Sequence, residues 1–158
     1  MRFSTTSASA AGPERGPGTS PLPWVGLRRR ARAFDALGLP AVALDRHGTI
    51  VAVNAAWSDL AVQGDPPIGL AVGDEYRAPG APDAGPRDRL AERRVAAGLA
   101  EVVGGRRALF EVERRWPWAT EERWFLVRAA AAAIDDGHGA VVVHLDITGR
   151  KHLEERIG

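Results

Sequence analysis

The stretch AVALDRHGTIVAVNAAW, residues 41–57, has the pattern of a β-hairpin that runs into a helix. Residues that favour strands fill 41–44 and resume over 49–53, and the turn residues Asp45 to Gly48 separate the two runs. Asn54 follows directly, and its side chain can accept hydrogen bonds from the free amides of a first helical turn. The stretch therefore predicts two antiparallel strands and a short helix over 54–62.

After this hairpin the chain predicts one long loop and one long helix. Residues 64–86 are rich in glycine and proline, with a short helical turn expected over 72–76. A helix over 88–103 has Leu90, Val95, Leu99, Val102 and Val103 on its apolar side, and it ends at Gly104-Gly105.

The last third of the chain alternates as strands do. Three runs are expected as strands, over 108–115, 123–134 and 140–147. In the middle run, Phe125, Val127 and Ala129 share one face. The segment 135–139, DDGHG, predicts a hairpin turn in which the glycines take positive φ.

Five strands joined mainly as hairpins predict an α+β fold, with an antiparallel sheet whose helices cover one face. Residues 39–148 form this domain. Residues 1–23 are expected to be a disordered tail, 24–38 a leading helix, and 149–158 the start of a C-terminal helix.

Composition excludes several kinds of chemistry. The chain of 158 residues has a net charge of +1 and no cysteine. Cysteine nucleophiles, disulfides and thiolate metal sites are thus impossible. The small net charge speaks against nucleic-acid binding, and no apolar run is long enough for a membrane helix. We expect a cytoplasmic protein that binds neither nucleic acid nor membrane.

Four pieces of the sequence together carry a resemblance to a known family. They are the hairpin ending in Asn54 with Ala55-Ala56-Trp57, the stop Gly104-Gly105-Arg106, the run Glu121 to Val127, and the closing DITGRK, residues 146–151. Their order and spacing resemble the PAS domain family over about residues 30 to 155. DITGRK is similar to the DIT-x-RK ending with which many bacterial PAS domains pass into a signalling helix. The resemblance implies a free-standing bacterial sensor domain.

The same ending predicts a coupling site. Asp146 can reach the free amides of the final helix or a basic neighbour, and the Thr148 hydroxyl can cap that helix. The resemblance implies that movement of the last strand would turn the helix. The alternative is an ordinary strand-to-helix junction.

The known PAS cofactors place demands that this chain largely fails to meet. Covalent flavin adducts and the hydroxycinnamate chromophore both require a cysteine. Haem-binding relatives use a histidine on the long helix, and 88–103 has none. The spacing of the four histidines predicts no metal site. The cofactor, if any, stays unknown.

A small-molecule pocket is nevertheless predicted on the inner face of the sheet. By the resemblance, His144 takes a polar, ligand-facing position on the last strand, where a half-buried imidazole could titrate near neutrality. The other candidate lining residues are Trp57, Tyr76, Phe110, Phe125 and Val127. For the four aromatic residues among them the alternative, which is the safer interpretation, is ordinary core packing. The run of small side chains over Ala129–Ala133 would leave room for a ligand or for a close-packed helix.

Three classes of function remain open at this level. The first is a PAS-type sensor that binds a small ligand or a protein partner and signals through its flanking helices. The second is an interaction adaptor with a filled core. The third, an enzyme of ketosteroid-isomerase type, is disfavoured because strand order and acid placement do not suit it; we expect no catalysis. A homodimer through the leading helix and the outer sheet face at Trp124 and Leu126 is expected, a separate signalling protein could be a partner, and Trp116-Pro117-Trp118 could be a contact surface.

Overall fold

The computed structural model describes residues 34–63, 69–78, 86–117, 121–135 and 137–157. The chain divides into two compact units, residues 1–36 and 37–158. In the first unit only residues 34–36 are described, and they are helical. The predicted tail over 1–23 and most of the predicted leading helix over 24–38 lie outside the described ranges.

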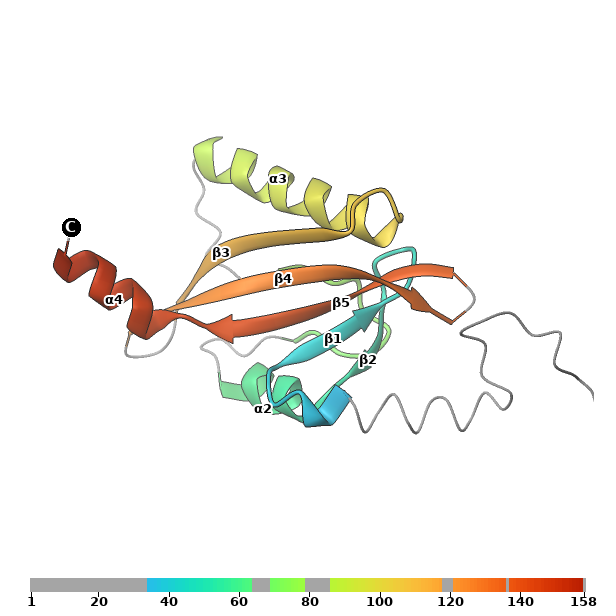
Figure 1. Ribbon diagram of the computed structural model, residues 1–158, viewed down its shortest axis with the longest axis horizontal. Helices are drawn as coiled ribbons and strands as arrows, with labels where there is room; N and C mark the ends of the chain where they lie inside the picture. The colour runs from blue at the N-terminus through green and yellow to red at the C-terminus, as the bar shows by residue number, and fades with distance from the viewer. Residues whose placement is uncertain (1–33, 64–68, 79–85, 118–120, 136, 158) are drawn as a thin grey trace, which may run out of the picture. The chain divides into compact units, whose positions relative to one another are not determined.

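The second unit is an α+β domain built on one antiparallel sheet. The strands stand in the order β2-β1-β5-β4-β3, and every neighbouring pair is antiparallel (Figure 1). The elements are β1 (Ala41–Leu44), β2 (Ile50–Val53), α2 (Ala55–Gln63), α3 (Pro86–Val103), β3 (Leu109–Pro117), β4 (Glu122–Ile134), β5 (Gly137–Asp146) and α4 (Thr148–Ile157). The predicted fold class is thus confirmed. No helix within the described ranges is both long enough and apolar enough to span a bilayer.

One face of the sheet packs against α2 and α3 and makes the core. Trp57 and Ala61 of α2 and Val95 of α3 join the inward side chains of the strands in a single buried cluster. Along β4 burial alternates, so that Phe125, Val127 and Ala129 are buried as predicted. The alternation follows from the two-residue period of a strand.

Local chemistry explains where the helices begin and end. The Asn54 Oδ1 accepts from the Trp57 N–H at 2.9 Å, which confirms the predicted cap of α2. The same oxygen accepts from the Ala41 N–H at 2.9 Å, which ties the helix to β1. At the end of α3, Gly105 has φ 77° and the Arg106 N–H bonds to the Glu101 carbonyl, as in a Schellman stop.

Two sequence predictions about turns were wrong. In the β4–β5 turn the positive φ belongs to Asp135 (53°), while Gly137 and Gly139 are part of β5. Gly139 is needed for another reason: a Cβ there would lie 2.2 Å from the Leu44 carbonyl oxygen. Residues 72–76 do not form a helical turn; a tight turn, closed by the bond from the Asp74 N–H to the Ala71 carbonyl, leads into a bridge from Glu75 to Thr49.

The buried apolar face of α3 contains fewer of its residues than the sequence predicted. Val95, Leu99, Val102 and Val103 are buried as predicted, but Leu90 is exposed. Leu90 lies one and a half turns before Val95, nearer the start of the helix.

Candidate functional site

Three ring side chains from different parts of the chain meet inside the core. Trp57 comes from α2, Tyr76 from the segment 69–78, and His144 from β5. All three are buried, and the His144 ring centroid lies 4.7 Å from that of Trp57 and 5.9 Å from that of Tyr76. We call these three residues the inner ring cluster. The structure therefore brings together three of the six predicted pocket residues.

The hydrogen bonds of His144 determine its tautomer. Its Nδ1 lies 3.0 Å from the Pro40 carbonyl oxygen, which can only accept, so Nδ1 carries the proton. In the neutral ring Nε2 is then an acceptor. The Tyr76 hydroxyl lies 2.6 Å from this Nε2 and donates to it. Both nitrogens of a completely buried imidazole are thus satisfied.

Burial keeps both polar members of the inner ring cluster neutral. Desolvation lowers the pKa of His144 to about 4, although its bond to the Pro40 carbonyl acts in the opposite direction. Desolvation likewise raises the pKa of Tyr76 above its usual range, in spite of the Arg114 guanidinium. The prediction that a half-buried His144 would titrate near neutrality is therefore wrong, because the imidazole has no access to water.

Tyr76 is held in place by backbone bonds between the segment 69–78 and the start of the edge strand β2. The Tyr76 N–H donates to the Gly48 carbonyl at 3.0 Å, and the Ile50 N–H donates to the Asp74 carbonyl at 2.9 Å. The Trp57 Nε1 donates to the Leu70 carbonyl at 3.3 Å, which links the segment to α2. A few backbone bonds beside the edge strand β2 thus position the phenol of Tyr76.

The other predicted pocket residues are not all in one place. Val127 lies in the same buried hydrophobic cluster as Trp57 and Tyr76 and pairs with His144 across β4 and β5, and Phe110 packs at the margin of that cluster. The Phe110 ring lies against Gly98 of α3, where an added Cβ would be only 2.4 Å away. Phe125 belongs instead to a second cluster with Leu60 and Trp116. The predicted grouping of Phe125 with His144 was wrong because two strand positions separate the two clusters.

The second cluster also decides the role of Trp116. Its side chain is buried and its ring centroid lies 5.1 Å from that of Phe125, so Trp116 is a core residue and not a contact surface. Trp118 lies outside the described residues. Among the small residues of β4, Ala129 is buried, whereas Ala131 and Ala133 are exposed. The room predicted at this run stays a prediction.

A buried arginine that was not predicted from the sequence lies near the inner ring cluster. Arg114 of β3 points inward and forms an ion pair with Glu92 of α3. Alternation along β3 places Arg114 on the same face as Phe110 and Val112, and this period could have revealed it. The pair balances one charge with another beneath α3.

The β5–α4 junction is tied to β4 from both sides. The Asp146 Oδ1 accepts from the Thr148 N–H at 2.9 Å, and its Oδ2 pairs with Arg123 at 3.4 Å. Both contacts predicted for Asp146, to a helix amide and to a basic neighbour, are thus present. Arg123 itself was not predicted.

Thr148 acts differently from the predicted cap. It is the first residue of α4, and its hydroxyl accepts from the Trp124 N–H at 3.0 Å instead of from helix amides. The Ile147 N–H donates to the Trp124 carbonyl at 2.8 Å. The hydroxyl therefore extends the β4–β5 ladder into the helix.

Basic residues of α4 fasten it to the outer face of the sheet. The Lys151 Nζ lies 2.5 Å from the Glu113 Oε1 and 4.7 Å from the centre of the Trp124 ring. Arg150 also pairs with Glu113. These cations lower the pKa of Glu113, chiefly through the hydrogen bond from Lys151. Glu113 was not predicted, although its outward position follows from the alternation of β3.

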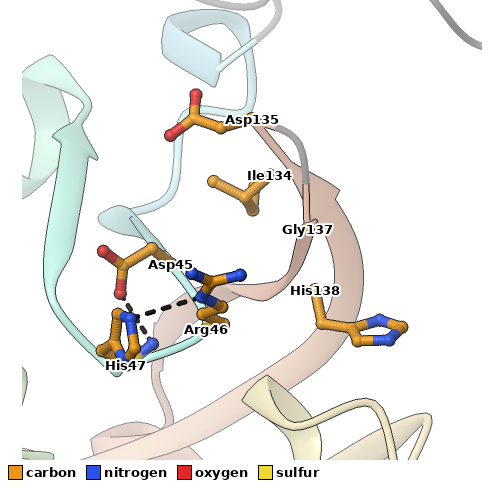
Figure 2. A pocket seen from close by; sticks show the side chains of 7 residues that line it. All are labelled: Asp45, Arg46, His47, Ile134, Asp135, Gly137 and His138. Atoms are coloured by element: carbon orange, nitrogen blue, oxygen red, sulfur yellow. Dashed lines mark hydrogen bonds between the residues drawn. The ribbon is translucent and has the colours of Figure 1, made fainter.

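An open hollow of about 270 Å³ lies at the opposite end of β5. Figure 2 shows its lining, which comes from the β1–β2 turn and the β4–β5 turn: Asp45, Arg46, His47, Ile134, Asp135, Gly137 and His138. Because β1 pairs with β5, the two turns become neighbours. The Asp45 Oδ1 accepts from the His47 N–H at 2.8 Å, and Arg46 Nε donates to His47 Nε2 at 3.3 Å. Side chains of both charges line it, and their grouping was not predicted from the sequence.

Among the described residues, no group of three or more histidines, cysteines, aspartates or glutamates could hold a metal ion. The predicted lack of a metal site and the open question of a cofactor remain predictions.

Comparisons with known proteins find a matching family profile and a relative among the curated proteins. A family profile described as "PAS fold" matches residues 34–152. An uncharacterized 104.1 kDa protein of Rhodobacter capsulatus is 37% identical over 121 residues, which are 73% of this chain and 12% of that protein. The chain thus spans about an eighth of the length of this relative.

Solved structures share the fold at low identity. The PAS domain of a protein from Colwellia psychrerythraea matches with a TM-score of 0.53 at 20% identity, covering 78% of this chain and 98% of that one. An RNA-binding light-oxygen-voltage receptor matches with a TM-score of 0.58 at 17% identity, covering 93% of this chain and 39% of that one. At these identities the likeness concerns the fold alone.

Proposed function

The chain belongs to the PAS family, and on that premise we propose that residues 37–157 sense a ligand or partner and signal through α4. PAS homologues are sensory and signal-transduction modules. The observation that carries the proposal is that the single strand β5 connects the inner ring cluster to the start of α4. His144 in the inner ring cluster and Asp146 at the junction are two residues apart on this one strand, and both point to the same face.

The route from core to helix is short and made of direct bonds. A shift of β5 at His144 moves Asp146, because two strand residues span less than 7 Å. Asp146 holds the Thr148 amide, and Thr148 holds the Trp124 amide of β4. A change in how β4 and β5 lie would therefore redirect the first turn of α4. Coupling between sites of this kind is typically about 1–3 kcal/mol.

The remaining parts of the proposal concern partners and place. The domain is non-catalytic and cytoplasmic. It forms a homodimer through the leading helix and the outer face at Trp124 and Leu126, and α4 passes its state to a signalling partner.

One observation supports the alternative function of an interaction adaptor. The three rings of the inner ring cluster contact one another where a ligand was expected, with Trp57 and Tyr76 centroids 6.4 Å apart. In an adaptor this packing would be permanent, and partner binding alone would bias α4.

Hydrogen exchange on the full chain tests the coupling. Four proteins are compared: wild type, His144→Gln, Thr148→Val and the double variant. We expect His144→Gln to change the opening free energy of the α4 amides by about 1 kcal/mol, and Thr148→Val to remove at least half of that change. Thr148→Ser keeps the hydroxyl and preserves the effect.

A destabilised variant away from β5 serves as the control. Val95→Ala of α3 lowers global stability by about 2 kcal/mol and leaves α4 exchange unchanged. If the His144 and Thr148 effects simply add, within about 0.5 kcal/mol, β5 does not transmit a signal and the proposal fails.

A further inference from the structure

The Nε2 of His144 requires one kind of group beside it. Its proton sits on Nδ1, facing the Pro40 carbonyl, so Nε2 can only accept a hydrogen bond. The ring is completely buried, so water does not substitute for a missing partner without cost. The group opposite Nε2 must therefore be a hydrogen-bond donor.

The surroundings also define size and charge. The donor now present is a single-ring phenol, packed with the Trp57 indole and the His144 imidazole. The buried site keeps that phenol protonated even with Arg114 nearby, and Arg114 is already paired with Glu92. A neutral molecule is thus favoured over an anion.

The residue that meets this demand can leave without breaking the sheet. Tyr76 belongs to the segment 69–78, which is joined to β2 and its preceding turn by backbone bonds at Gly48 and Ile50 and by the bridge from Glu75 to Thr49, and to α2 by the Trp57 indole. The β1–β5–β4 ladder does not pass through it. A rotation of the Tyr76 side chain therefore requires no break in the β1–β5–β4 pairing.

We propose that Tyr76 is an internal stand-in for the ligand: a small neutral aromatic molecule with an O–H or N–H donor displaces its side chain and bonds to His144 Nε2 against Trp57. The inference rests on the proposed sensory function and names its ligand class. Displacement frees the segment 69–78 and changes the polar partner of β5 at the same time. The tethered phenol competes with the ligand and weakens its apparent affinity.

Binding of 4-methylphenol and of toluene to the full chain tests this inference. Toluene is the matched probe, with the same ring and methyl group but no donor. We expect Tyr76→Ala to bind 4-methylphenol at least tenfold more tightly than wild type, because the internal competitor is gone. In Tyr76→Ala, 4-methylphenol should bind at least tenfold more tightly than toluene, which leaves Nε2 unpaired.

Nitrogen NMR of labelled histidine locates the bond. In Tyr76→Ala the ¹⁵N shift of His144 Nε2 should move toward its wild-type value when 4-methylphenol is added, and not with toluene. The variant Tyr76→Ala/His144→Leu should lose the preference between the probes. If Tyr76→Ala does not fold, Tyr76→Phe is the second variant, because it keeps the ring and lacks the donor. We expect Tyr76→Phe also to bind 4-methylphenol more tightly than the wild type does.

Equal affinity of the two probes, or equal affinity of wild type and the Tyr76 variants, overturns the inference. This outcome is separate from a failure of the sensory function. The exchange experiment on α4 uses no ligand, so it tests signalling alone. Binding that depends on the donor, without any change in α4 exchange, would refute signalling and still support the binding site.

Discussion

Strand β5 carries two polar residues that live in opposite environments. His144 is completely buried, neutral and bonded to neutral partners, whereas Asp146 is exposed and paired with Arg123 and the Thr148 amide. Only Leu145 separates them in the sequence. The strand thus leaves the core within two residues, at the point where α4 begins.

The difference teaches which forces act at each end of the proposed signal path. In the core a lost hydrogen bond leaves buried groups unsatisfied, so each contact matters strongly and salt has no access. At the junction the contacts are exchanged readily with water and are screened by ions. Removal of a contact should be costly at His144 and mild at Asp146.

The largest expected loss of stability comes from a substitution at the buried residue, His144. His144→Leu deprives the buried Tyr76 hydroxyl of its acceptor and leaves the Pro40 carbonyl with only the bond from the backbone N–H of residue 144, so we expect a loss of about 2–4 kcal/mol in unfolding free energy. Urea denaturation measures this loss. Leu145→Ala, on the exposed side of the same strand, is the control and should cost less than about 1 kcal/mol. Equal losses would show that burial does not distinguish the two positions.

The next effect is a stability loss in mild acid. The pKa of His144 falls from 6.5 to about 4 on folding, so between these values the unfolded state binds a proton that the folded state refuses. Stability is complete above pH 6.5 and decreases as the pH falls to about 4, by about 3 kcal/mol in all. Unfolding free energies across this range measure it, and His144→Gln should flatten the curve.

The junction differs in its acid window. The pKa of Glu113 lies below 4.5, so its contribution is present above that pH and disappears only as the pH falls further. A curve that stayed flat from pH 6.5 to 4.5 in the wild type would contradict the buried neutral imidazole.

The smallest effect concerns the exposed side. Asp146→Ala removes the Arg123 pair and the acceptor of the Thr148 amide, and we expect a loss of up to about 1 kcal/mol. Asp146→Asn keeps an acceptor and should lose only the part that high salt removes. Urea denaturation at low and high salt measures both variants. A loss that is independent of salt in both would show that the ion pair contributes nothing.

Much of the architecture could be read from periodicity and capping. The Asn54 cap, the Gly105 helix stop and the alternation of β4 depend on neighbours within a few residues, so the sequence predicts them. Phe125 was assigned to the wrong cluster because alternation gives the face of a strand but not the position along it. Tyr76 was correctly chosen as a core aromatic, yet its bond to His144 spans 68 residues of sequence.

The junction shows the same division. DIT indicated that Asp146 and Thr148 would bond locally, and Asp146 does so. The Thr148 hydroxyl instead bonds to Trp124, because β4 lies beside β5 and its Trp124 N–H points toward the start of α4.

The sequence by itself determined the elements, the antiparallel connections and the polar character of position 144, since these follow from local spacing and side-chain chemistry. Only the tertiary structure decided that His144 is neutral, that Tyr76 donates to it, and that Glu113 holds α4. These depend on burial and on distances between residues remote in the chain, which the fold sets when the strands take the order β2-β1-β5-β4-β3.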